Sequence, residues 1–305
     1  MSRPFAFFTD NAYLILITTM IFWGGNAVAG RFAVGEVSPL LLTCLRWLLG
    51  ASVLLVLARR QLSQDWPTIR RHLPYIAFMG TTGFAIFNGL LYTALNHTTA
   101  INATIVQAAI PMFIFALNFL IFRMRVRWVQ IAGYSVTLLG VLVAASRGDF
   151  QQLANLDINR GDLIMVLAGL VYATYSSVLH AKPALHWLSF VTMLSATAAI
   201  VSIPLAVYEA TTHDLILPTT WTSWVVILYT TIFPSVIGQA LFIRGIELIG
   251  GNAAGLFVNL VPIFGSILAV LLLGESFQLY HALALFLVLG GIMFAQRIGV
   301  RSRAP

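Results

Sequence analysis

The chain has 305 residues, of which 59% are hydrophobic and only 9% charged, whereas soluble domains carry roughly a quarter charged residues. This composition, with a mean hydropathy of +0.91, excludes a soluble protein and predicts an integral membrane protein with no room for a large soluble domain. The net charge of +7 does not indicate a nucleic-acid partner, because the basic residues lie in short loops between apolar runs.

Ten apolar runs follow one another along the chain, each of roughly 18 to 23 residues, the length that a helix needs to cross the hydrocarbon of a bilayer. Strands of a membrane barrel would instead show short segments of alternating polarity. We therefore predict an all-α integral membrane protein with ten transmembrane helices. The predicted spans are 12–30, 38–58, 74–95, 100–122, 128–146, 162–181, 186–207, 221–243, 252–273 and 279–297.

The first run also resembles a secretory signal peptide. Arg3 precedes its apolar core, and the sequence AVA at 27–29 resembles a cleavage site. Cleavage would leave nine spans and remove the partner of the sixth, and the sequence WGGN at 23–26 is unusually polar for a signal core. We therefore expect the segment to be retained.

Loop charges orient the spans. With the N-terminus inside, the external segments hold only Arg31, Arg147 and Arg160. This imbalance predicts a multi-pass protein of the inner (plasma) membrane with both termini cytoplasmic. The basic residues on the cytoplasmic side are then Arg3, Arg59, Arg60, Arg70, Arg71, Arg123, Arg125, Arg127, Lys182, Arg244, Arg297, Arg301 and Arg303.

The chain contains an internal duplication. The stretch 88–146 recurs about 151 residues later at 239–297, where Pro262 stands opposite Pro111 and the hydropathy repeats in step. Five spans per half is an odd number, so the second half enters the membrane from the opposite side, as in the inverted repeats of many secondary transporters. The predicted domains are a five-helix repeat at 1–146, an external linker at 147–161 and a second repeat at 162–305.

Short motifs are similar to those of a known family. They are FWGGN at 22–26, SP at 38–39, RWLLGA at 46–51, Pro111, Pro262, GE at 274–275 and GG at 290–291. The chain resembles the drug/metabolite transporter superfamily, of the EamA type with two five-helix repeats, and within it the YddG-type amino-acid exporters. One departure is Arg123-Met124, where the family often shows the Gly-Glu pair of 274–275.

Five carboxamide side chains lie inside the predicted spans. An unpaired amide in hydrocarbon costs several kcal/mol, so it normally faces the interior of the bundle. An interhelical hydrogen bond explains each amide alone, but five exceed what helix association requires. We predict that they line a substrate site: Asn26, Asn88, Gln107, Gln239 and Asn259, with Asn88 and Gln239 at equivalent places of the two repeats.

Aromatic residues complete the predicted substrate site. Trp23 and Tyr172 lie at comparable points of the first and sixth spans. Tryptophans near span ends are instead interpreted as interface anchors; these are Trp66, Trp128, Trp187, Trp221 and Trp224. The aromatic residues assigned to the site are Trp23, Phe84, Phe87, Tyr92, Tyr172 and Tyr175.

Prolines inside the spans indicate gating elements. A mid-helix proline cannot donate to the carbonyl four residues earlier, so Pro234 frees the carbonyl of Thr230. Simple packing kinks are the alternative. The recurrence of Pro111 at Pro262 favours a shared mechanical role, and the fourth and ninth spans are the predicted gates.

Arg46 is the ionised residue that lies clearly within a span. It either binds a substrate carboxylate or ties a helix to backbone carbonyls and a neighbouring helix. The resemblance favours the structural role, because the family keeps this arginine across exporters of dissimilar substrates. No Asp or Glu lies in the middle of a span, so a neutral or zwitterionic substrate is expected rather than a cation.

No phosphate loop, metal spacing or cysteine pair is present, and Cys44 stands alone. We therefore predict no enzyme activity, cofactor or metal, and a small-molecule substrate in a lipid bilayer, with a monomer favoured. The predicted function is export of amino acids, aromatic and other neutral ones, by alternating access. The alternatives are export of another metabolite or drug, such as a purine or an organic cation, and a membrane-embedded enzyme.

Overall fold

The computed structural model describes residues 11–123, 128–149, 159–250, 254–255 and 257–300, and in these ranges the regular structure is helical, with no strand. Eight helical segments are long and apolar enough to cross a membrane, from Ala12–Phe32 to Trp221–Ile249. The predicted spans 252–273 and 279–297 correspond to the shorter apolar helices Val258–Leu273 and Leu279–Ala295. The all-helical membrane class is thus confirmed.

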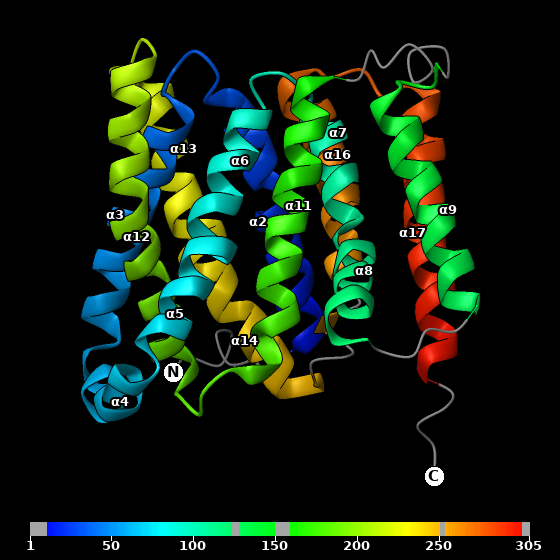
Figure 1. The fold of residues 1–305 in the computed structure, drawn as a ribbon. Helices are drawn as coiled ribbons and strands as arrows, with labels where there is room; N and C mark the ends of the chain where they lie inside the picture. The colour runs from blue at the N-terminus through cyan, green and yellow to red at the C-terminus, as the bar shows by residue number, and fades with distance from the viewer. Residues whose placement is uncertain (1–10, 124–127, 150–158, 251–253, 256, 301–305) are drawn as a thin grey trace.

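The helices form an upright bundle in which the described chain ends lie near one end (Figure 1). In the first half they are α2 (Ala12–Phe32), α3 (Pro39–Leu57), α4 (Arg59–Arg71), α5 (Leu73–Gly80), η1 (Thr81–Ile86), α6 (Phe87–Ala94), α7 (Ala100–Ala108), α8 (Ile110–Phe122) and α9 (Trp128–Ala145). In the second half they are α11 (Arg160–Val178), η2 (Leu179–Ala181), α12 (Trp187–Thr212), α13 (Trp221–Thr230), η3 (Thr231–Ile237), α14 (Gly238–Ile249), η4 (Val258–Leu260), α16 (Val261–Leu273) and α17 (Leu279–Val300).

Within the described residues, four of the predicted spans are broken in their middle. The segments η1 and η3 are π-helical turns, and a shift of 151 residues carries η1 onto 232–237, inside η3. α8 and α16 each begin with a proline in the first turn, Pro111 and Pro262, where the missing N–H costs no hydrogen bond. π-Helical turns inside α-helices frequently mark functional sites. η1 and η3 are therefore candidate parts of such a site.

Two close helix pairs join the halves of the chain. α9 packs on α17 and α3 on α12, and in Figure 1 the first pair lies at one side of the bundle. A Cβ added at Gly133 would lie 2.7 Å from the carbonyl oxygen of Gly291, so the backbones of α9 and α17 are in direct contact. The Thr137 hydroxyl also lies 3.5 Å from the carbonyl oxygen of Val288, a residue 151 positions later.

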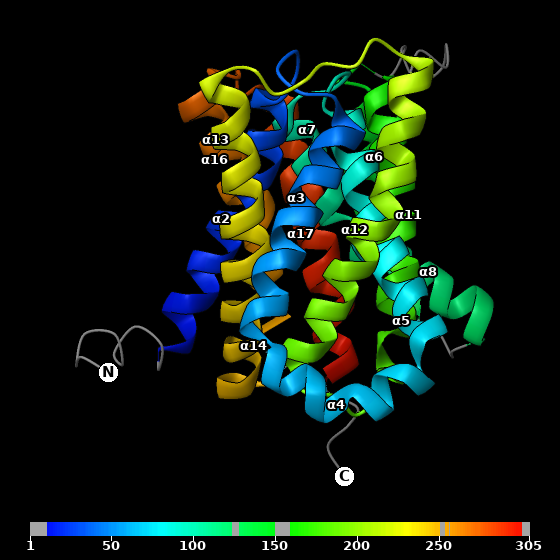
Figure 2. The same cartoon turned by 90° about the vertical axis from the view of Figure 1, so that its left-hand side faces the viewer.

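A helix that the sequence analysis did not predict lies across one end of the bundle. α4 fills the polar stretch between the second and third spans, and Figure 2 shows it below the other helices. Its Ile69 is fully buried, whereas Trp66 and the arginines of its first and last turns are exposed. Since the basic residues face outward and one apolar residue anchors the helix, α4 has the form of an interfacial helix.

Two glutamates tie the second half to the first at the opposite end. The Glu209 carboxylate accepts hydrogen bonds from the backbone N–H groups of Leu40 and Leu41 at the start of α3, at 3.0 Å. The Glu275 carboxylate does the same for Ala100 and Ile101 at the start of α7, at 2.8 and 3.1 Å. A carboxylate at a helix N-terminus is stabilised by the helix dipole and the free N–H groups.

Candidate functional site

A buried arginine forms the centre of the bundle. Arg46 on α3 is only 4% exposed. Its Nη1 donates to Asn26 Oδ1 at 3.1 Å, to Asn88 Oδ1 at 2.7 Å and to the Tyr92 hydroxyl. Its Nε donates to Ser235 Oγ at 2.7 Å. One guanidinium therefore joins α2, α3, α6 and η3.

The second π-helical turn completes this network. Pro234 removes the helical partner of the Thr230 carbonyl, and the Ser235 hydroxyl donates to that carbonyl at 2.7 Å. The Pro234 carbonyl accepts from Trp23 Nε1 at 3.2 Å. The break in η3 is thus covered by protein hydrogen bonds, which is the condition for irregular backbone at membrane depth.

The structure explains why the motif at 22–26 contains glycine and asparagine. A Cβ at Gly24 would lie 2.7 Å from the backbone nitrogen of Gly265, so α2 and α16 touch through their backbones. Asn26 accepts from Arg46 and, at 2.9 Å, from the Tyr92 hydroxyl. Small residues that permit close helix approach and polar residues that bond across helices are the usual content of such contacts.

A small cavity lies beside Arg46, and we call it the polar chamber. Its volume is about 70 Å³. Arg46 is the one charged side chain among its described wall residues, and the amides of Asn26, Asn88, Gln107 and Gln239 line the same chamber. The other residues of its wall are Trp23, Trp47, Gly83, Phe84, Phe87, Tyr172 and Pro234.

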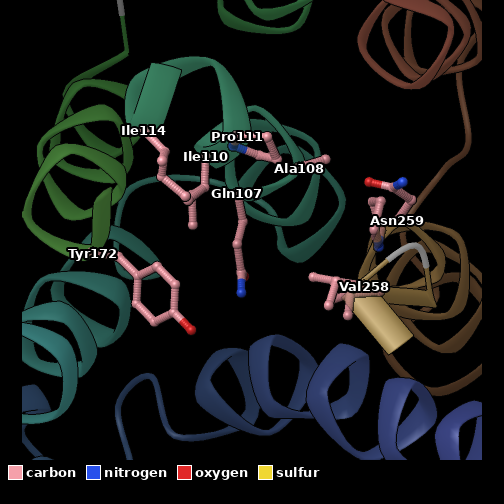
Figure 3. A pocket seen from close by; sticks show the side chains of 11 residues that line it. Gln107, Ala108, Ile110, Pro111, Ile114, Tyr172, Val258 and Asn259 are labelled. Carbon is pink, nitrogen blue, oxygen red and sulfur yellow. The ribbon is translucent and has the colours of Figure 1, made fainter. Parts of the chain in front are cut away.

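A larger cavity, the apolar chamber, lies next to the first. Its volume is about 230 Å³. Gln107 and Tyr172 line both chambers, so the two adjoin. In Figure 3 the Gln107 amide and the Tyr172 hydroxyl point toward the same space, with Val258 and Asn259 on the opposite side. The remaining wall residues are Ala108, Ile110, Pro111, Ile114, Gly255, Val261 and Pro262.

Nine of the eleven predicted site residues line one or both chambers. Asn88 and Gln239, which the repeat places at equivalent positions, both line the polar chamber, and Asn259 lines the apolar one. The structure brings together Trp23, Asn26, Phe84, Phe87, Asn88, Gln107, Tyr172, Gln239 and Asn259, together with the predicted gating prolines Pro111 and Pro262.

The other two predicted site residues, Tyr92 and Tyr175, lie behind the walls of the chambers and line neither. Tyr92 is 1% exposed, and its hydroxyl is taken up by Arg46 and Asn26. The ring of Tyr175 packs against Phe84 and Tyr172, with centroids 6.2 and 5.3 Å apart. It fits there because Gly83 has no side chain: a Cβ at that position would lie 2.5 Å from the ring.

Sequence reasoning missed two residues of the site. Trp47 stacks on Phe84 with centroids 4.8 Å apart and lies under the Arg46 guanidinium, 4.8 Å from ring centroid to Cζ. Ser235 holds Arg46 Nε. Trp47 follows Arg46 directly within the motif at 46–51, which was an available signal. Ser235 gave none, because a serine beside a proline is common in any helix break.

Comparisons with known proteins identify the family of the chain. The sequence profile of the EamA-like transporter family matches residues 10–146 and again residues 159–296. The chain belongs to this family. It is therefore a transporter that spans a membrane several times, and the two matches correspond to the two halves of the chain.

The individual relatives share about a quarter to a third of their residues with the chain over the matched regions. The chain is 25% identical to the uncharacterised transporter YetK of Bacillus subtilis over 285 residues, which cover 92% of this chain and 85% of that protein. It is 32% identical over 139 residues, 46% of each chain, to a probable terminal-alkyne amino-acid exporter of Streptantibioticus cattleyicolor. One solved crystal structure superimposes with a TM-score of 0.63 at 20% identity, covering 96% of this chain and 99% of that one, which supports the fold alone.

Proposed function

We propose that the protein is a secondary transporter that exports amino acids, aromatic and other neutral ones, across the inner membrane by alternating access. The observation that carries this proposal is the pair of joined chambers between helices of both halves. Their wall combines several carboxamides, aromatic rings and aliphatic side chains. A largely apolar pocket with a few fixed polar groups is the usual form of a small-molecule site.

The proposed architecture is ten transmembrane helices in two inverted five-helix repeats, 1–146 and 162–305, joined by an external linker at 147–161. The pairs α3–α12 and α9–α17 support it, because each pair joins segments about 151 residues apart, as a two-fold axis in the membrane plane requires. The positions of η1 and η3 support it in the same way.

The proposed orientation places α4 and both termini in the cytoplasm. It predicts that a cysteine at Gln64 on α4 reacts only with membrane-permeant reagents in intact cells, whereas one at Thr219, between α12 and α13, reacts with impermeant reagents. Both positions are exposed. Cys44 is first replaced by alanine. The reverse labelling pattern would contradict the orientation and the inverted repeat together.

Within this scheme the chamber residues bind substrate, and the breaks at Pro111 and Pro262 act as gates. Both prolines line the apolar chamber and begin α8 and α16. A change in the angle at either break would alter the chamber wall directly. Tyr92 and Tyr175 support the wall from behind, and the four hydrogen bonds of Arg46 hold the helices that carry the polar chamber.

Amino acids fit the chambers better than organic cations do. None of the described Asp and Glu residues lines either chamber, and a site for cations would be expected to hold a carboxylate. The amino-acid exporter among the relatives supports the same substrate class. A monomer suffices for this function, because all of the site comes from one chain.

The test is flux through the purified protein in liposomes. A panel of radiolabelled amino acids, nucleobases and organic cations is measured with and without a proton gradient. We expect saturable flux of phenylalanine and leucine and none of the cations. Flux of a nucleobase or a cation without that of any amino acid would overturn the proposed substrate class.

A further inference from the structure

The Arg46 guanidinium is only partly used by the protein. A guanidinium has five N–H donors, and the described hydrogen bonds use those of Nε and Nη1. No described residue accepts a hydrogen bond from Nη2. Nη2 is not one of the sealed-off, unpaired side-chain atoms of the described residues, and Arg46 lines the polar chamber.

The charge of Arg46 is not neutralised by its partners. All four acceptors are neutral oxygens, namely two amides, a phenol and a serine hydroxyl. The described carboxylates near the bundle are engaged elsewhere: Glu209 and Glu275 bind helix N-termini, and Asp162 accepts from Thr98. A buried cation without a carboxylate partner is costly, so the polar chamber favours an anionic group.

The two chambers offer different surroundings to the two ends of a ligand. The polar chamber presents the Arg46 cation, and the adjoining chamber presents mainly aliphatic groups and the Tyr172 ring. Gln107 and Tyr172 stand at the junction. A ligand with a charged head and an apolar tail therefore has one favourable orientation when it is bound.

We infer that Arg46 is a substrate-binding residue as well as a tie between helices: Nη2 binds the carboxylate of a substrate whose apolar side chain extends past Gln107 and Tyr172 into the apolar chamber. This rests on the proposed function, because it assigns the acid group of the exported amino acid to one atom. The substrate class is a monocarboxylate with an apolar side chain. No described carboxylate lines either chamber to pair with its ammonium group.

The experiment is equilibrium binding to the purified, full-length protein in lipid nanodiscs. Four probes share one ring: phenylalanine, phenylalaninamide, phenethylamine and 3-phenylpropionate. The first and the last carry a carboxylate and are expected to bind. The amide and the amine lack it and are expected to bind at least about 10-fold more weakly, since a hydrogen bond to a charged group is lost. This comparison needs no variant.

Asn26→Asp tests the assignment to Arg46. It keeps both acceptor contacts of Asn26 while placing a carboxylate against Nη1, so the fold is retained and the charge of Arg46 is neutralised. We expect binding of phenylalanine to weaken roughly 10-fold or more and the difference between phenylalanine and its amide to shrink. The control Gln64→Glu adds the same charge on exposed α4 and is expected to leave binding unchanged.

The outcomes separate the inference from the proposed function. Equal binding of phenylalanine and phenylalaninamide to the unaltered protein overturns the inference and leaves amino-acid export intact. A full carboxylate preference in Asn26→Asp also overturns it, because the recognition group would then lie elsewhere. Binding of none of the four probes overturns the proposed function and the inference together.

Discussion

The two chambers differ in how their walls are held. The polar chamber is held by hydrogen bonds that converge on Arg46 from α2, α6 and η3. The apolar chamber is formed by the end of α7, by η4 and by the starts of α8 and α16 around two prolines, and its wall is mainly aliphatic. The first is a fixed framework, whereas the second is suited to change shape, because van der Waals contacts can be exchanged without leaving a buried polar group unpaired.

The largest expected effect is loss of the framework in Arg46→Leu. The four hydrogen bonds that join four helices are lost, and Asn88 Oδ1 is left without its described donor. A buried unsatisfied group costs about 1–3 kcal/mol. We expect the folded yield of Arg46→Leu to collapse. In Arg46→Lys we expect a smaller loss, measured as a lower apparent melting temperature, because lysine lacks the forked donors of arginine. Ile114→Ala in the apolar chamber is the matched comparison. If it destabilised the purified protein as much as Arg46→Leu, the two chambers would not differ in the way described.

The next effect concerns the volume of the apolar chamber. Ile114 lines the chamber of about 230 Å³, and Ile114→Trp would fill part of that space. We expect the apparent affinity for phenylalanine to fall at least about 10-fold while that for alanine stays within a factor of two, because steric overlap is costly. Competition flux in proteoliposomes measures both. A parallel loss for the two substrates would place the side chain elsewhere.

A smaller effect is expected when a single amide of the polar chamber is removed. Gln239→Met keeps the size of the side chain and removes its hydrogen bonds, so affinity should fall several-fold, about 1 kcal/mol for one hydrogen bond. Gln239 is the suitable position because Asn88 also holds Arg46 and the Phe84 carbonyl. Unchanged affinity in Gln239→Met at equal protein levels would remove this residue from the site.

The smallest effect on affinity is expected from the proline changes. Pro111→Ala and Pro262→Ala permit continuous helices and shift the balance between inward- and outward-open forms. Maximal flux should change more than affinity, and both variants should change in the same direction. If the proline variants instead bound substrate more weakly and kept their maximal flux, the prolines would belong to the binding site and not to the gate.

The sequence predicts the all-helical membrane class correctly, because the length of an apolar run is a local property. It also placed Asn88 and Gln239 at one level, since the repeat fixes their register. α4 was missed because its 13 residues carry one buried apolar side chain, Ile69, and give no apolar run. The sequence placed Pro111 in the middle of one span, whereas in the structure α8 begins at Ile110 with Pro111 in its first turn.

The positions of Tyr92 and Tyr175 behind the chamber walls could not be read from the sequence. Tyr92 lies four residues after Asn88, so both share a helix face. The longer side chain of Tyr92 reaches Arg46, and its hydroxyl accepts a hydrogen bond there instead of facing a chamber. Tyr175 follows Tyr172 by three residues, yet Gly83 lets its ring pack behind the wall. Such outcomes depend on contacts between residues far apart in the sequence, which a pattern along one helix does not contain.

The central claim is that one substrate occupies both chambers, with its head at Arg46 and its side chain in the apolar chamber. The most direct measurement is competition by glycine, alanine, 2-aminobutyrate, norvaline and norleucine against radiolabelled phenylalanine in proteoliposomes. Each added methylene should strengthen competition up to about fourfold, as about 0.8 kcal/mol per buried CH₂ implies, until the chamber is filled. Equal competition by glycine and norleucine, or none by either, would contradict the claim.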